Sequence, residues 1–236
     1  SFVTVHGAHL RSPARVGVPQ TAAELPEPAC VSVEEAPCNI LVTGIGGTGV
    51  ITIGALLGMA AHLEGKAVSV LDMTGMAQKN GGVQSHIRIG QRAGDLSCAR
   101  ISSGGAHLLL ACDLLEATSA AVLDKISRDV TRVIANANLT MPGGYAQEPD
   151  KMAISLDPLR EVLHRHVVAA STCFFEASSL ATALTGNSIG ANLFMLGAAC
   201  QAGYLPVSAG PIEQAIGLNG VAVEGSKAAF AWGRRA

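Results

Sequence analysis

A glycine cluster at residues 44–49, GIGGTG, restricts the possible folds of this chain more than any other feature. It follows a short apolar run rich in β-formers at 39–43 and precedes an apolar segment at 50–62 that predicts a buried helix. A second apolar run, 67–71, ends at Asp72. This succession predicts a strand, a glycine loop, a helix and a second strand, which is the order of one βαβ unit.

The loop fits the pattern G-x-G-x-x-G, and its candidate binding residues are Gly44, Gly46, Gly47, Thr48 and Gly49. Glycines allow positive φ and a close approach of backbone N–H groups, and a helix N-terminus adds the positive end of its dipole. Asp72 stands 23 residues after Gly49, where dinucleotide-binding folds place a ribose-binding acid. The loop therefore predicts an anion or nucleotide site.

Two alternatives remain open for these residues. The glycines can serve only to pack the first helix closely on the first strand, and Asp72 can cap a helix or a turn. A Walker A phosphate loop is excluded, because Val50 and Ile51 stand where lysine and Ser or Thr are required.

Downstream of residue 74, apolar runs alternate with helical patterns. Residues 83–89 alternate apolar and polar side chains, which predicts a half-exposed strand, with residues 99–101 beside it. Further strands are expected at 107–112, 132–137 and 168–174. Helices are expected at 114–126, with Asp113 as its N-cap, and at 159–167, 176–185, 191–202, 211–216 and 222–232. The pattern predicts an α/β fold with a doubly wound, mainly parallel sheet, an antiparallel insertion near 83–101 and a helical C-terminal third.

Composition excludes several classes of function. A net charge of −2 and only eight aromatic residues (five Phe, two Tyr and one Trp) argue against nucleic-acid binding. No apolar run reaches the length of a membrane span. The six cysteines contain no C-x-x-C pair, which argues against a zinc ribbon or an iron–sulfur cluster and favours reduced thiols. No acid–base pair, activated nucleophile or metal triad is apparent, so we expect no catalytic residue and no metal ligand.

A few polar residues are candidates for docking. His86 and Arg88 are expected on the polar side of one strand, and with Lys79 they form a candidate anion-binding or docking face. The alternative is an ordinary solvated strand. Asn192, within an expected helix, can hydrogen-bond the backbone of a glycine loop or lie in a subunit contact; an exposed or capping role is the alternative.

The N-terminal part differs from the rest of the chain. Residues 1–37 hold five of the ten prolines and show no sustained periodicity, apart from a short strand expected at 2–5. The first residue is Ser rather than Met. We interpret 1–37 as an extended interdomain linker.

Four separated segments resemble the gamma domain of 2-oxoacid:ferredoxin oxidoreductases, with most similarity to the long fused indolepyruvate ferredoxin oxidoreductases. Residues 41–90 carry the glycine loop, the double glycine Gly81-Gly82 and the pair Ile87-Arg88. Later parts of the family pattern are resembled by residues 106–117 and 219–235, and the segment that precedes the gamma domain is resembled by residues 1–5. The chain departs from the residues common in relatives at Gln78, Asn80 and His107.

The resemblance implies a Rossmann-like gamma domain over residues 38–236. It implies a parent enzyme that oxidatively decarboxylates an aryl-2-oxoacid to an acyl-CoA and reduces ferredoxin. That enzyme uses thiamine diphosphate with magnesium, iron–sulfur clusters and coenzyme A, held by other parts. This chain is then a structural or assembly fragment, inactive alone and without a firmly bound cofactor. Gly81, Gly82, Lys79, His86, Arg88 and Asn192 are its candidate docking residues.

The implied partners are the thiamine-binding alpha and beta domains, with ferredoxin bound through the parent enzyme. We also expect a homo-oligomer in the cytoplasm, without membrane or nucleic-acid contacts. The competing hypothesis is a self-contained NAD- or FAD-binding Rossmann protein, supported by the glycine loop and Asp72.

Overall fold

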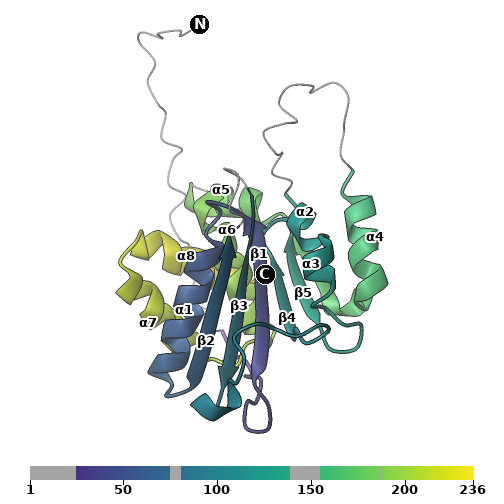
Figure 1. Ribbon diagram of the computed structural model, residues 1–236. Helices are drawn as coiled ribbons and strands as arrows, with labels where there is room; N and C mark the ends of the chain where they lie inside the picture. Colours follow the sequence, from purple (N-terminus) through teal and green to yellow (C-terminus); the bar gives the residue numbers. More distant parts are fainter. Residues whose placement is uncertain (1–24, 75–80, 139–154, 187) are drawn as a thin grey trace, which may run out of the picture.

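A six-stranded sheet lies between two layers of helices in the computed structural model (Figure 1). The structure describes residues 25–74, 81–138, 155–186 and 188–236. The strands are β1 (Cys38–Ile45), β2 (Ala67–Thr74), β3 (Gly82–Gly90), β4 (Leu108–Ala111), β5 (Arg132–Asn136) and β6 (Thr172–Phe175), in the order β2-β3-β1-β4-β5-β6. Among the described strands, β3 alone runs in the opposite direction to the other five, so the predicted mainly parallel sheet with an antiparallel insertion is confirmed.

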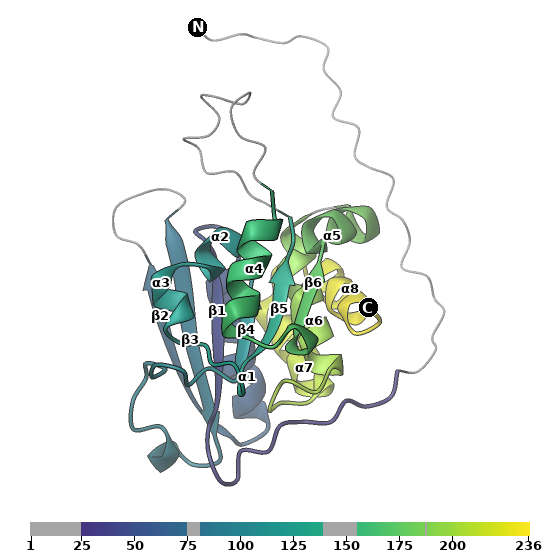
Figure 2. The same ribbon diagram turned by 90° about the vertical axis from the view of Figure 1, so that its right-hand side faces the viewer.

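The helices cover the two faces of the sheet unequally. The larger core lies under α1 (Val50–Leu63), α5 (Ala177–Thr185), α6 (Ala191–Gln201), α7 (Ala209–Asn219) and α8 (Val223–Gly233). The smaller core lies under α2 (Leu114–Ala117), α3 (Ala120–Leu123) and α4 (Asp157–His166) on the other face (Figure 2). The predicted helical C-terminal third is thus present, and together with α1 it covers one face of the sheet. None of the described helices is both long enough and apolar enough to cross a membrane.

The strand predicted at 83–89 is confirmed as β3, which lies between β1 and β2, with Val83, Ser85, Ile87 and Ile89 buried and Gln84 and Arg88 partly exposed. The expected exposure of His86 was wrong, because the segment that leads to β4 covers this side of the strand. His86 is fully buried there, and its Nδ1 accepts a hydrogen bond from the Ile101 amide at 3.2 Å. Residues 99–101 form no strand; they cover β3 as irregular chain.

The helix expected at 114–126 is interrupted. The hydroxyl of Thr118 donates to the carbonyl oxygens of Leu114 and Leu115, and Ser119 begins the separate helix α3. Such side-chain to backbone hydrogen bonds compete with helix continuation. The predicted N-cap is confirmed, since Asp113 accepts a hydrogen bond from the Glu116 amide at 3.0 Å.

Residues 25–37 contain no helix or strand, yet they lie against the domain. The Val31 amide donates to the Leu205 carbonyl at 2.9 Å, and Val33 belongs to the larger core with 4% of its surface exposed. The strand expected at 2–5 lies outside the described residues. The linker interpretation of 1–37 stays a prediction, but its last part is attached to the fold.

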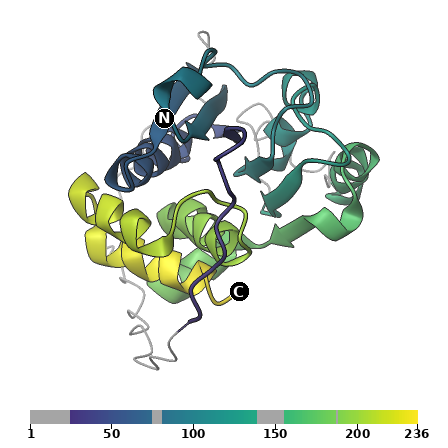
Figure 3. The ribbon, with the colours of Figure 1, turned by 90° about the horizontal axis from the view of Figure 1, so that it is seen from below.

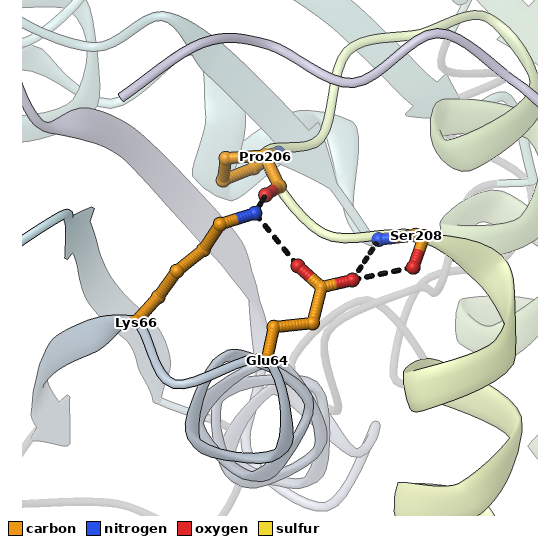
Figure 4. A network of polar contacts seen from close by, with 4 residues as sticks. All are labelled: Glu64, Lys66, Pro206 and Ser208. Atoms are coloured by element: carbon orange, nitrogen blue, oxygen red, sulfur yellow. Dashed lines mark hydrogen bonds and ion pairs between the residues drawn. The ribbon is translucent and has the colours of Figure 1, made fainter. Parts of the chain in front are cut away.

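A polar network joins the end of α1 to the turn before α7 (Figure 4). Lys66 forms an ion pair with Glu64 at 2.6 Å and donates to the Pro206 carbonyl at 2.5 Å, while Ser208 donates to Glu64 through its amide and its hydroxyl. Partial burial by itself raises the pKa of Glu64, but the hydrogen bonds from Lys66 and Ser208 outweigh it and lower that pKa. The network fixes α1 against α7.

Candidate functional site

The glycine loop forms a tight turn between β1 and α1. Gly47 and Gly49 both have φ of +89°, in the left-handed region that favours glycine. Gly44 lies where a Cβ atom would collide with the side chains of Val50 and Thr48. Thr48 closes the turn, because its amide and its hydroxyl both donate to the Ile45 carbonyl, at 3.1 and 2.7 Å. Gly44, Gly47 and Gly49 are therefore needed for the conformation of this turn.

The N-terminus of α1 presents free donors. The first amide bonded within the helix is that of Ile53, which donates to the Gly49 carbonyl at 3.3 Å. The amides of Val50, Ile51 and Thr52 have no acceptor among the described residues. The first turn holds no acidic residue and its N-cap is a glycine, so nothing within the helix neutralises the positive end of its dipole. Free amides of this kind are the groups with which helix N-termini bind anions, and the anion site expected from the sequence stays a prediction.

A half-open groove of about 420 Å³ runs beside the loop. The first turn of α1, the end of β2 and the start of β3 form its walls together with the loop. Its lining residues are Ile45, Gly46, Gly47, Gly49, Val50, Ile51, Thr52, Thr74, Gly81 and Val83. The groove lies at the carboxyl ends of β1 and β2, the edge at which open α/β sheets bind ligands.

Asn192 holds the loop from the other side. It lies in the first turn of α6, is buried, and donates its side-chain amide to the Thr48 carbonyl. The hydrogen bond from Asn192 to the backbone of a glycine loop, one of the roles considered from the sequence, is therefore present. The partner was not identifiable from the sequence, because 144 residues separate the two groups.

The double glycine connects this loop to β3. Gly46 donates its amide to the Gly81 carbonyl at 3.0 Å. A Cβ atom on Gly82 would overlap the Glu116 carboxylate, which accepts a hydrogen bond from Gln84 at 3.0 Å. Sequence reasoning missed Gln84 and Glu116, since nothing in their spacing indicates that they meet. Lys79 lies outside the described residues.

Asp72 lies apart from the glycine loop. It pairs with Ser85 of β3, which in turn pairs with Val42 of β1, so a whole strand separates Asp72 from β1. Its carboxylate is near Gly54, in the second turn of α1. In a dinucleotide-binding fold the acid follows the strand next to β1. The inserted β3 thus removes the geometric support for a ribose-binding role of Asp72.

His86 and Arg88 do not share an exposed surface. The pKa of His86 falls to about 4, chiefly because of burial and also because of the nearby charges of Arg100 and Lys125. Arg88 is half-buried and donates to the Asn39 side chain at 2.9 Å and to the Cys98 carbonyl. Both side chains hold the β3–β4 connection against the sheet. Their role in docking stays a prediction.

Comparison with known proteins gives a family match over most of the chain. The family model described as pyruvate ferredoxin/flavodoxin oxidoreductase matches residues 39–236. The indolepyruvate oxidoreductase subunit IorB of Methanothermobacter thermautotrophicus is 34% identical over 169 residues, which cover 72% of this chain and 81% of that subunit. The subunit of the same name from Pyrococcus horikoshii is 30% identical, over 77% of this chain and 85% of its own length.

Solved structures share the fold at low identity. The pyruvate oxidoreductase subunit PORC of Thermotoga maritima has a TM-score of 0.60 and 19% identity, covering 85% of this chain and 97% of its own. The 2-oxoglutarate:ferredoxin oxidoreductase of Magnetococcus marinus, with 2-oxoglutarate, coenzyme A and succinyl-CoA bound, has a TM-score of 0.61 and 18% identity. The match covers 86% of this chain but 31% of that one, so the same fold also occurs as one part of a much longer chain.

Proposed function

Because the chain belongs to the pyruvate ferredoxin/flavodoxin oxidoreductase family, we propose that it is the gamma component of an enzyme that oxidises an aryl-2-oxoacid with ferredoxin as electron acceptor. The named relatives of 30% identity and above are indolepyruvate oxidoreductase subunits, and this is the single observation that carries the choice of substrate. The chain contributes binding and assembly surfaces, while thiamine-binding and cluster-binding parts perform the chemistry.

The test is an anaerobic assay of the complete oxidoreductase. With the chain present, the enzyme should reduce ferredoxin when indolepyruvate and coenzyme A are supplied, and should do so more slowly with pyruvate. The chain alone should give no ferredoxin reduction. Activity of the chain alone, or a preference for an aliphatic 2-oxoacid, would contradict this proposal.

Within that enzyme, we assign the glycine loop to an anionic group of a ligand, and coenzyme A phosphate is the best candidate. The support is the set of free amides at the start of α1, the uncompensated dipole and the adjoining groove. Calorimetric titration of the complete oxidoreductase should show binding of coenzyme A. It should show no binding of pantetheine, which lacks the nucleotide phosphates.

Gly47→Ala provides a test with a matched control. An alanine at Gly47 meets no neighbouring atom but must adopt φ of +89°, so the loop changes shape. Gly65→Ala imposes the same kind of strain at φ +70°, also in open space, beyond the far end of α1. Binding should weaken in Gly47→Ala only. Equal binding of coenzyme A by the wild type and both variants would show that the glycine loop is not part of the coenzyme A site.

The competing hypothesis, a self-contained NAD- or FAD-binding protein, makes a different prediction. It requires micromolar binding of a dinucleotide by this chain alone, and loss of that binding in Asp72→Ala. We expect neither result, because β3 separates Asp72 from the loop strand.

A further inference from the structure

One exposed side of α1 carries several large apolar side chains. What we call the α1 stripe consists of four residues spaced four positions apart, Ile51, Ala55, Met59 and Leu63. Ile51, Met59 and Leu63 expose 47%, 40% and 41% of their surfaces. The opposite side of α1 belongs to the larger core, and two polar side chains, Thr52 and His62, are exposed among the residues of the stripe. Large apolar side chains that gather on one exposed side of a helix often mark an interaction surface.

The outer edge of β2 is also uncovered. β2 pairs with β3 on one side, and no strand within the described ranges pairs with its other side. Proteins protect exposed edges with short strands, lysine, proline or bulges. β6, at the other edge of the sheet, has only four residues. β2 has eight residues, with one charged side chain and neither lysine nor proline, so its edge is open to strand pairing.

The edge of β2 and helix α1 are adjacent. Cβ atoms placed on Gly54 and Gly58 would lie 3.2 and 3.6 Å from the side chain of Val70, and the one on Gly54 would also meet Ser85 of β3. The axis of α1 thus lies over the boundary between β2 and β3, with α7 on its inner flank (Figure 3). Strand edge and helix together form one surface.

We propose that this surface binds a second copy of the chain, with the two β2 strands antiparallel about a two-fold axis near Val70. The pairing joins the two six-stranded sheets into one continuous sheet. A second copy supplies what the surface lacks: an unpaired edge of the same length and a matching helix side. The inference is independent of the proposed function.

Helix spacing supports this geometry. Neighbouring strands of a sheet are about 4.8 Å apart, so the two-fold axis would lie about 2.4 Å outside β2. The axis of α1 lies about 2.4 Å on the other side of β2, which places it about 5 Å from the two-fold axis. The two α1 helices would then be about 10 Å apart, which is the upper end of ordinary helix packing. Val70 lies beneath Gly54 and Gly58 of α1. The two α1 helices would therefore come closest to each other at Ala55 and Gly58, whose side chains are the smallest on this side of the helix.

Charge and area agree with a pair of copies. A register centred on Val70 places Asp72, the one charge of β2, opposite Val68 of the other copy, so no like charges meet. Eight residues of strand extend about 26 Å, and strand plus helix present a surface about 20 Å high. Roughly 500 Å² per copy, or about 1,000 Å² in total, reaches the lower limit for a specific interface.

Sedimentation of the full chain tests the proposal. The wild type should form a dimer. Ala55→Glu places two carboxylates near the axis and should raise the dimer dissociation constant about tenfold or more. Ala183→Glu, at an exposed alanine of α5, is the matched control and should leave the dimer intact. Circular dichroism should show that both variants are folded.

Hydrogen exchange of the wild type gives a readout that needs no variant. The β2 amides should become more protected as protein concentration rises through the dissociation constant, while those of β6 should not change. A wild type that stays monomeric, a dimer insensitive to Ala55→Glu, or concentration-independent exchange in β2 would each overturn the proposal. A monomer would leave the surface to a different chain of the enzyme.

Discussion

Asn192, in the first turn of α6, donates its side-chain amide to the carbonyl oxygen of Thr48 in the glycine loop. A C-terminal helix thereby fixes the loop that precedes the first helix of the fold. Asn192 is buried, and a Cβ atom placed on Gly49 would lie 3.4 Å from its amide nitrogen. The loop conformation therefore depends on packing across the larger core as well as on its own glycines.

Replacing Asn192 by alanine should loosen the loop. The Thr48 carbonyl loses its donor, and we expect a loss of about 1–2 kcal/mol in the free energy of unfolding. Asn219→Ala, at the exposed end of α7, is the control and should change stability by less than about 0.5 kcal/mol. Denaturant unfolding measures both. Faster hydrogen exchange at Gly46 should accompany Asn192→Ala; equal stability of the two variants would contradict the role assigned to Asn192.

Glycine substitutions in α8 should have opposite effects at two positions of the same helix. A Cβ on Gly233 would overlap the backbone carbonyl of Phe194 in α6, so Gly233→Ala must separate the two helices. We expect a loss of about 1–3 kcal/mol or more. Gly225→Ala meets no neighbouring atom and should stabilise the helix by up to about 1 kcal/mol. Thermal unfolding of the two variants should move in opposite directions; two similar shifts would mean that α6 and α8 are not in such close contact.

The burial of His86 should make stability depend on pH. Its pKa is about 4 in the folded protein, against 6.5 for the free side chain, because burial and the charges of Arg100 and Lys125 disfavour the protonated form. The unfolded chain therefore binds the proton more readily. Stability should fall as pH decreases from about 6.5 to about 4, by up to about 3 kcal/mol from this residue, and level off below.

His86→Asn isolates that contribution. The asparagine oxygen can accept the hydrogen bond from the Ile101 amide that Nδ1 now accepts, but it does not titrate. Urea unfolding at several pH values should give a flatter profile for the variant than for the wild type between pH 6.5 and pH 4. Parallel profiles would show that His86 is not buried as described.

Local patterns predicted the parts of the fold that depend on local rules. The spacing of residues 39–72 indicated β1, the glycine loop, α1 and β2, because strand, turn and helix signals there are all short-range. Alternation at 83–89 indicated an added strand, and β3 is that strand. The sequence could not show that β3 separates Asp72 from β1, since strand order is a property of the whole sheet.

The same limit applies to burial and to long-range contacts. His86 has the pattern of an exposed position, and it is buried only because residues near Ile101 fold over it. The Thr118 hydroxyl, which ends α2 early, leaves no signal distinguishable from an ordinary helix residue. The contact between Glu116 and Gly82 joins segments whose spacing carries no motif. These side chains shape the site, and each depends on tertiary packing.

The six cysteines should separate into two groups in alkylation experiments. Cys38, Cys112 and Cys200 are buried, and burial raises the pKa of each thiol to about 12. Cys30, Cys98 and Cys173 are exposed. Because the thiolate is the reactive form, N-ethylmaleimide should label only the exposed group in the folded protein and all six after denaturation. Mass spectrometry of digested peptides gives the distribution. Rapid labelling of Cys112 under native conditions would contradict its place beside the glycine loop, where its Cβ lies 3.0 Å from a Cβ placed on Gly44.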